Sequence, residues 1–407
     1  MPEFFERRFD SKKLKTVSAA IVFIFLIPYT ASVYNGLSRL FGMVFDLGKN
    51  GGTYIIIAMA ILSAAYVTLG GYKATALNDF FQGIIMLIGI ATVVFLTVNE
   101  KNGLTEAVKA LNDIGAEGGV EKSTLGSVFG PDPINLFGVV ILTSLGTWGL
   151  PQMVQKFYAI KNESAIHKGT VISTFFAIVV SGGCYFLGGF SRLYHASIDI
   201  EANGYDSVIP AMLENLSPLL IGLVVILVLS ASMSTLSSLV MASSSTLTID
   251  VIKDNIVKKM DEKKQLLSIR ILIVIFIAIS VVIAIVQYKS SITFIAQLMG
   301  VSWGALAGAF LAPFLYSLYW KKITKASVWV SFIFGSGFMT LNMLMRGSFP
   351  ALLQSPINAG AFAMIAGLII VPIVSAFTKK PEEKLVEDAF ASYNVVHEVK
   401  RSTALEN

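Results

Sequence analysis

Long apolar segments with few charged residues are the feature that most constrains this chain. The stretch from Leu216 to Ile249 contains no charged residue and exceeds the length of about 20 residues that a helix needs to cross a bilayer. Lipid offers no partners to backbone polar groups, and the ten-residue alternation of a membrane barrel is absent, so such segments predict helices. Ten of them follow one another: Val17–Phe45, Tyr54–Leu69, Thr75–Val98, Phe137–Ala159, Val171–Phe190, Ser217–Lys253, Leu266–Val286, Ile292–Tyr319, Ser327–Leu344 and Gly360–Phe377.

The composition supports a polytopic membrane protein rather than a soluble enzyme. The 407 residues are 55% hydrophobic and only 14% charged, with a mean hydropathy of +0.72. The apolar segments offer no histidine or paired carboxylates for acid–base or metal chemistry, which argues against an enzyme. The net charge of +5 comes from basic residues in loops, so membrane topology explains it and no nucleic-acid partner is predicted.

The distribution of basic residues predicts the orientation. Most of the 31 Lys and Arg residues lie at the two ends and in alternate loops, which places both ends in the cytoplasm. We therefore predict a cytoplasmic N-terminal segment (1–15), a transmembrane domain (16–378) and a cytoplasmic tail (379–407), in the cell inner (plasma) membrane.

Hydroxyl groups are concentrated in the second half of the stretch Ser217–Lys253. Eight serines and two threonines lie between Ser230 and Thr246. At helical spacing, Ala231, Ser234, Thr235 and Ser238 share one face. Two interpretations are open: close helix packing, in which hydroxyls bond to the carbonyl one turn back, or a weak site for a hard monovalent cation. Spacing alone favours packing.

The segment Phe137–Ala159 is irregular in its middle. Gly146, Gly149 and Pro151 predict a helix that breaks at membrane depth, which is tolerable only beside a cavity or neighbouring protein. A simple proline kink is the alternative.

The hydroxyl-rich stretch resembles a known family motif. The pattern A-x-M-S-T, followed by a serine run and T-x-D, resembles the eighth core helix of the sodium:solute symporter family. The resemblance implies that the Ala231 carbonyl and the Ser234 and Thr235 hydroxyls hold Na⁺, the coupling ion.

Two further motifs resemble the same family. In Y-x-T-L-G-G-x-K-A-x-x-x-N-D-x-x-Q, the resemblance places Asp79 on the sodium exit path, although a carboxylate there could also cap a helix. The sequence GTWGLPQ resembles the unwound sixth core helix, which implies that Thr147, Trp148 and Gln152 form a gate and substrate contact. A family glutamine that lines the substrate pocket lies near Gln297, which could otherwise simply bond to a neighbouring helix.

The resemblance implies the fold of the chain and also that the chain is incomplete. The fold is all-α, with two inverted five-helix repeats and the site at their interface. The opening P-E-F-F-E-x-R-F resembles the loop before the third core helix, so about three helices are expected upstream. We therefore expect an N-terminally incomplete member whose sodium site lacks ligands from the first core helix and which is not competent alone.

The implied function is sodium-coupled symport of a small polar solute by alternating access. The partners implied are the bilayer and an amino acid, sugar, vitamin or carboxylate. The alternative function is a symporter-like sensory or regulatory module, but the tail 379–407 is too short to fold as a kinase or receiver domain.

Overall fold

The described part of the chain is entirely helical. The structure is a computed structural model, and it describes residues 1–45, 47–48, 50–114, 125–160, 162–197, 205–214, 217–257, 260–290 and 295–394, none of which forms a strand. This confirms the all-α prediction. The end of the tail, from 395 onward, lies outside the described residues.

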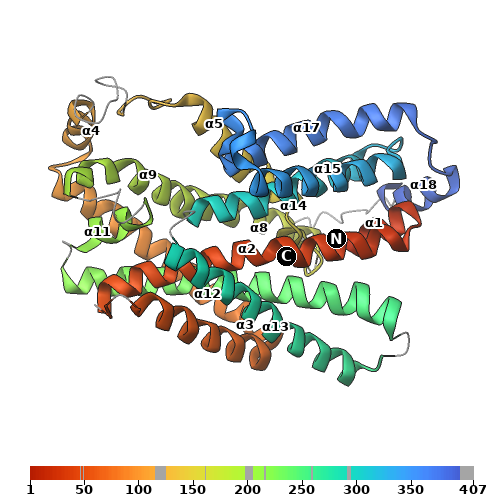
Figure 1. The fold of residues 1–407 in the computed structure, drawn as a ribbon, viewed down its shortest axis with the longest axis horizontal. Coiled ribbons are helices and arrows are strands. Elements are labelled where there is room, and N and C mark those ends of the chain that lie inside the picture. The colour runs from red at the N-terminus through yellow and green to blue at the C-terminus, as the bar shows by residue number, and fades with distance from the viewer. Residues whose placement is uncertain are drawn as a thin grey trace, which may run out of the picture.

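Long helices lie side by side and make up most of the molecule (Figure 1). They are α2 (Lys12–Phe45), α3 (Gly51–Glu100), α8 (Glu163–Phe176), which continues through η2 (Ala177–Ser181) into α9 (Gly182–Phe190), α12 (Pro218–Thr246), which continues into η5 (Leu247–Ile256), α13 (Glu262–Ser290), α14 (Ile295–Tyr319), α15 (Lys325–Leu344) and α17 (Pro356–Phe377). Shorter elements connect them: α1 (Pro2–Phe9), α4 (Leu104–Asp113), α5 (Pro133–Ser144), α6 (Gly146–Gly149), α7 (Pro151–Phe157), η3 (Ser191–Ser197), η4 (Tyr205–Ser207), α11 (Val208–Glu214), η6 (Arg346–Ser348), α16 (Ala351–Gln354), α18 (Glu383–Phe390) and η7 (Ala391–Asn394).

The number of spans agrees with the sequence. Within the described ranges, nine helical segments are long and apolar enough to cross a membrane, and a bent pair of shorter segments makes a tenth. Helix α3 supplies two of the nine, because Gly71 (φ 61°, ψ −176°) interrupts it between the spans Gly51–Gly71 and Thr75–Glu100. A left-handed φ of this kind is one that glycine adopts readily, and it separates the two predicted segments Tyr54–Leu69 and Thr75–Val98.

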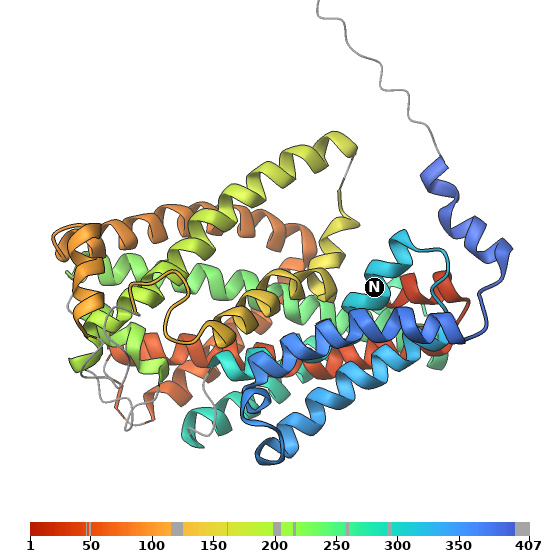
Figure 2. The ribbon, with the colours of Figure 1, turned by 90° about the horizontal axis from the view of Figure 1, so that it is seen from above.

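The two ends of the described chain lie together. Helices α1 and α18 occupy one end of the bundle, whereas α4 and α11 occupy the other (Figures 1 and 2). Helix α18 packs on α1, where the ring of Phe390 lies 5.3 Å from the Arg8 guanidinium carbon. An even number of spans returns the chain to its starting side, as the order of basic loops predicts.

The bent pair confirms the predicted helix break. The segment Pro133–Gly149 meets α7 at an angle of 49°. Leu150 between them is extended (φ −86°, ψ 120°), and Pro151 begins the next helix, where a proline costs no hydrogen bond. A simple proline kink is therefore wrong, since Leu150 leaves helical geometry altogether.

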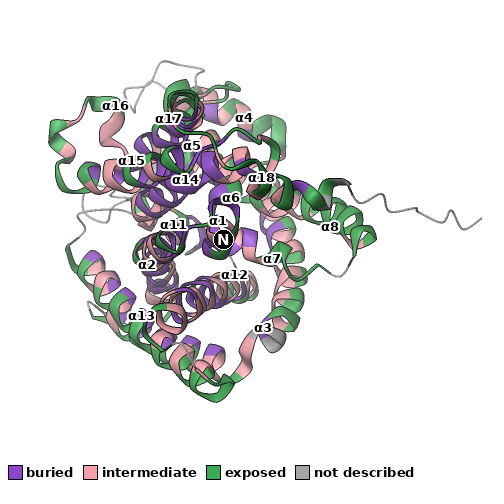
Figure 3. Cartoon of the chain, turned by 90° about the vertical axis from the view of Figure 1, so that its right-hand side faces the viewer, coloured by how far each residue is buried: buried purple, intermediate pink, exposed green. Residues whose placement is uncertain are grey.

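Helix α14 forms the centre of the tightly packed half of the molecule. In the apolar part of its span, 78% is buried inside the structure, whereas only 6% is buried in the span Glu163–Tyr194, which runs through α8 and α9. Figure 3 shows this contrast between α14 and the exposed α8. Glycines allow the close approach: a Cβ on Gly304 would lie 2.7 Å from the Cα of Gly360, and one on Gly335 would lie 2.2 Å from the carbonyl carbon of Gly308. Membrane helices pack backbone against backbone where small residues lie at their interface.

This packing predicts that Gly335→Ala destabilises the protein. The added methyl group meets the backbone of α14, which has no flexible end to move aside, so we expect a loss of about 1–3 kcal/mol. The measurement is the melting temperature of purified protein in detergent, followed by size-exclusion chromatography after heating.

The matched control is Gly337→Ala on the same helix, where a Cβ has nothing within 4 Å. This change should be neutral or stabilising, because alanine is the better helix former by about 0.5–1 kcal/mol. Equal melting temperatures for the two variants would contradict the close approach of α15 and α14.

Candidate functional site

The hydroxyl-rich helix predicted to hold sodium is α12. It begins at Pro218 after the N-cap Ser217, remains α-helical to Thr246, and widens into the π-helical η5. The hydroxyl of Thr235 donates to the carbonyl of Ala231 at 2.9 Å, so two of the predicted ligand oxygens are neighbours. This is the bond that the packing interpretation predicts, but a hydroxyl that donates one hydrogen bond keeps its lone pairs for a cation.

The third predicted ligand lies beside the predicted exit residue. The Ser234 side chain lies close to the Asp79 carboxylate on α3, but the structure shows no hydrogen bond between these two residues. Asp79 Oδ1 is buried without a hydrogen-bond partner among the described residues. Asp79 also lies about two helical turns beyond the interruption at Gly71, so the capping interpretation is wrong. The structure thus places the exit-path candidate directly against the sodium-helix candidate.

A small cavity of about 170 Å³ joins three helices at this point. It is lined by α3, α7 and α12 through Thr75, Ala76, Asp79, Gln152, Gln155, Lys156, Ser237, Ser238 and Met241. Asp79, predicted from one motif, and Gln152, predicted from another, therefore meet at one site with the hydroxyl helix.

Gln152 has the most unusual side chain in this cavity. It is only 4% exposed, yet neither its Oε1 nor its Nε2 has a hydrogen-bond partner among the described residues. A buried amide left in this way costs about 1–3 kcal/mol per unsatisfied group. Water or a polar ligand in the cavity would supply the missing bonds.

The cavity carries opposite charges. Lys156 lies on the same wall as Gln152 and acts electrostatically on Asp79 across the space. A carboxylate, an ammonium group and a free amide in one small space give both donors and acceptors to a polar molecule, which is the usual arrangement of a specific ligand site.

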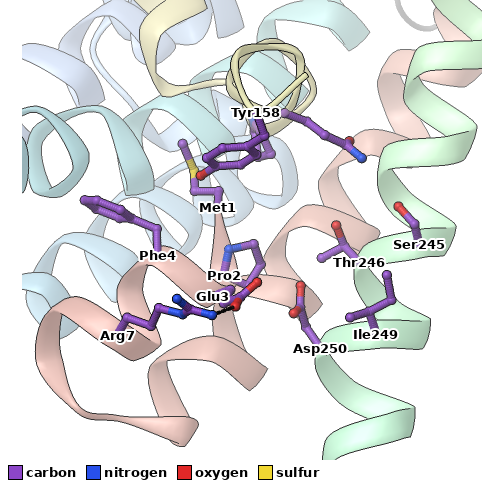
Figure 4. A pocket seen from close by; sticks show the side chains of 12 residues that line it. Met1, Pro2, Glu3, Phe4, Arg7, Tyr158, Ser245, Thr246, Ile249 and Asp250 are labelled. Atoms are coloured by element: carbon purple, nitrogen blue, oxygen red, sulfur yellow. Dashed lines mark hydrogen bonds and ion pairs between the residues drawn. The ribbon is translucent and has the colours of Figure 1, made fainter. Parts of the chain in front are cut away.

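A larger cavity of about 520 Å³ opens at the end of the bundle that carries α1 (Figure 4). Its walls are α1, α7 and the junction of α12 with η5, and its lining includes Glu3, Tyr158, Thr246 and Asp250. Gln155 lines both cavities. One face of α12, from Ser237 through Thr246 and on to Asp250 in η5, therefore borders both spaces in turn.

An ion-pair network closes this end of α12. The ammonium group of Lys15 on α2 lies 2.9 Å from Glu6 and 3.5 Å from Asp250, and it also pairs with Asp254. Both Lys15 and Asp250 are buried. The network ties η5 to α1 and α2, so the acidic residue of the T-x-D motif has a structural partner.

Ala231, Ser234 and Thr235 line neither cavity, and three further predicted residues, Thr147, Trp148 and Gln297, also lie outside both. Trp148 is 57% exposed, and the Thr147 hydroxyl donates to the Ser144 carbonyl at 2.8 Å. Gln297 is half-buried in the first turn of α14. The structure does not bring the latter three residues to Gln152, and their roles stay predictions.

The sequence analysis did not predict two polar residues of α7 that line the small cavity. Gln155 and Lys156 follow Gln152 at i+3 and i+4, the spacing that places side chains on one helix face. That spacing was a usable signal for both residues.

Known transporters resemble this chain in sequence. The family model described as the sodium:solute symporter family matches residues 1–335. A sodium/proline symporter of Staphylococcus aureus is 27% identical over 416 residues, covering 98% of this chain and 76% of that protein. Its counterpart in strain JH9 is 28% identical over 415 residues, with the same coverage.

A solved structure shares the fold. It is the substrate-bound, outward-open state of a Na⁺-coupled sialic acid symporter, with a TM-score of 0.66 and 15% identity, covering 94% of this chain and 78% of that one. The inverted-repeat transporter fold expected from the motifs is thereby confirmed. A family match over residues 1–335 decides the identity of the chain: it belongs to the sodium:solute symporter family, membrane transporters with Na⁺ as the coupling ion.

Proposed function

We propose that this protein moves a small polar solute across the plasma membrane together with Na⁺, by alternating access. The observation that carries the proposal is Gln152, whose amide is 4% exposed and lacks partners on both polar atoms. It lines one cavity with Asp79 and the hydroxyl face of α12. In this proposal the amide binds the solute.

Sodium binds on α12 in this proposal, at the Ala231 carbonyl and the hydroxyls of Ser234 and Thr235. Their support is the 2.9 Å contact between Thr235 and Ala231 and the proximity of Ser234 to Asp79. Neutral oxygens suit a hard cation that must also leave again. Asp79 then receives the ion, and the face of α12 leads it past Thr246 to Asp250.

The solute is proposed to be an amino acid, with L-proline as the first compound to test. The relatives named sodium/proline symporters support this choice. The charges of Asp79 and Lys156 beside one amide suit a zwitterion, because each charged end finds an opposite partner.

Binding and flux together test the proposal. Purified protein should bind labelled L-proline, or another solute from a panel of amino acids, sugars, vitamins and carboxylates, more tightly in NaCl than in choline chloride. Reconstitution tests transport: accumulation of the same solute under an inward sodium gradient would overturn the sequence-based expectation that these residues are not competent alone. Sodium-dependent binding without accumulation would fit that expectation or the sensory alternative, and an absence of binding in both salts would refute the site.

Gln152→Ala should weaken solute binding about tenfold, because the change removes the amide that would bond to the solute. Sodium affinity in the absence of solute should stay the same, since the ligands on α12 are untouched. The measurement is equilibrium binding of labelled solute at saturating sodium. Gln265→Ala is the matched control, since Gln265 lines neither cavity and accepts a bond from Lys253; equal losses in the two variants would remove Gln152 from the site.

Ser234→Ala and Thr235→Ala should each raise the sodium concentration for half-maximal solute binding, by roughly tenfold for the loss of one ligand oxygen. Thr235→Ser keeps the hydroxyl and should stay near the unmodified value. Ser232→Ala, on the same helix but on a different face, serves as the control. A shift in the control as large as in the two variants would show that the helix as a whole, rather than its ligand face, was perturbed.

Both ends of the chain are proposed to be cytoplasmic. Single cysteines at Lys109 on α4 and Lys263 on α13, in a Cys184→Ser background, should react with an impermeant reagent from opposite sides of the membrane. Both side chains are exposed, so access does not limit the reaction. In intact cells we expect rapid labelling at 109 alone, and labelling at 263 alone would reverse the orientation.

A further inference from the structure

A third cavity, of about 340 Å³, lies away from the transport site, between α1, the end of α14 and α18. Its lining includes Arg7, Arg8, Ser317, Asp388 and Phe390. Helix α1 precedes the first span, and Ser317 lies in the last turn of α14. The cavity therefore lies at the end of the bundle, where the spans leave the apolar layer.

Arg8 is buried in this cavity with donors to spare. It is 3% exposed, and its Nε donates to the Ser317 carbonyl at 3.4 Å. The rings of Phe9 and Phe390 each lie 5.3 Å from its guanidinium carbon. Nη1 and Nη2, however, have no hydrogen-bond partner among the described residues, and neither does the Ser317 hydroxyl.

These three atoms make an incomplete site. Burial lowers the pKa of the Arg8 guanidinium from its ordinary value, yet arginine retains its proton in proteins. A buried positive charge needs an anion or several hydrogen bonds. Asp388 lines the same cavity but forms no hydrogen bond with the two free nitrogens.

We propose that Arg8 and Ser317 bind a phosphate group in this cavity. The guanidinium fork matches two phosphate oxygens, and a serine hydroxyl can donate to a third. Arg7 adds a second positive charge to the lining. The phosphate comes either from the headgroup of an anionic lipid or from solution.

The surroundings fit a headgroup at a membrane interface. Aromatic and basic residues gather at this end of α14: Tyr316 and Trp320 pack edge to face with ring centroids 5.8 Å apart, and Lys321 lies over the Phe390 ring at 5.5 Å. Such belts mark the level of lipid headgroups, and basic pockets between helix ends bind anionic lipids there.

Helix α18 of the tail would cover the bound phosphate. Helix α18 forms one wall of the cavity through Phe390, and the Tyr393 hydroxyl beyond it donates to the Leu318 carbonyl at 3.0 Å. A phosphate between Arg8 and Ser317 thus links α1 to α14 directly beneath α18.

The experiment measures stabilisation of the full chain in detergent. Melting temperature is followed during titration with phosphatidylglycerol, with phosphatidylcholine, and with inorganic phosphate against chloride at equal ionic strength. We expect a saturable rise, because a ligand that binds only the folded state stabilises it by mass action. A rise with phosphatidylglycerol alone identifies a lipid source, and a rise with inorganic phosphate identifies a soluble one. No rise with either would overturn the proposal.

Variants assign the effect to the site. Arg8→Gln should abolish the rise, whereas Lys13→Gln, which removes an exposed charge at the same end, should leave it intact. An equal rise in Arg8→Gln and in the unmodified protein would overturn the assignment.

Two milder variants keep the test decisive if Arg8→Gln does not fold. Ser317→Ala removes a hydroxyl that has no partner to lose and should weaken phosphate binding about tenfold. Asp388→Asn removes a negative charge from the lining and should tighten it. Unchanged affinity in both variants would show that phosphate binds elsewhere.

Discussion

The need to satisfy polar groups at membrane depth is the constraint on which this structure depends. Most hydroxyls in the spans meet it within their own helix: Thr30 donates to the Leu26 carbonyl at 3.0 Å, Thr92 to Ile88 at 2.8 Å and Ser280 to Phe276 at 2.9 Å. These bonds let polar side chains reside in an apolar layer without a function. The exceptions are therefore informative. Among the polar side chains with unsatisfied atoms, Gln152 and Asp79 lie against α12, and the buried hydroxyls of Ser243, Ser244 and Thr248 on α12 and η5 also lack partners among the described residues.

The two halves of the bundle use small side chains for different purposes. Around α14, glycines bring backbones into contact and leave little room, as the 2.2 Å and 2.7 Å approaches of a hypothetical Cβ show. Along α12, serines and threonines leave space, and two cavities follow the same helix face. The alternating access proposed for this protein would require one part that keeps its shape and another that can rearrange, and these two kinds of packing provide the contrast.

The sequence predicted what depends on local pattern. Apolar length gave the spans, and Gly149 with Pro151 gave the break at Leu150, because both follow from backbone chemistry alone. The family motifs gave Ser234 and Asp79 separate roles at the sodium site and on its exit path. Their proximity was not predicted, since no local rule relates residues on separate helices. Arg8 is a residue whose environment the sequence predicts wrongly. It lies in a run of charged residues, which predicts a solvated side chain, but the packing of α18 and α14 around it makes it buried.

Helices α7 and α12 line both cavities, and the contacts that hold each helix determine how a passage between the cavities can open. The far end of α12 is fixed, because η5 is tied through Asp250 and Asp254 to Lys15, which also pairs with Glu6. Among the described residues, no ion pair of this kind holds helix α7: Leu150 before it is buried but extended, and the segments meet at 49°. Rotation at Leu150 would carry Gln152 and Gln155 together, since they lie on one face of the same short helix. We therefore expect the passage from the small cavity to the large one to open by movement of α7 against a stationary α12, so that Gln152, the side chain proposed to bind the solute, would also control its exit.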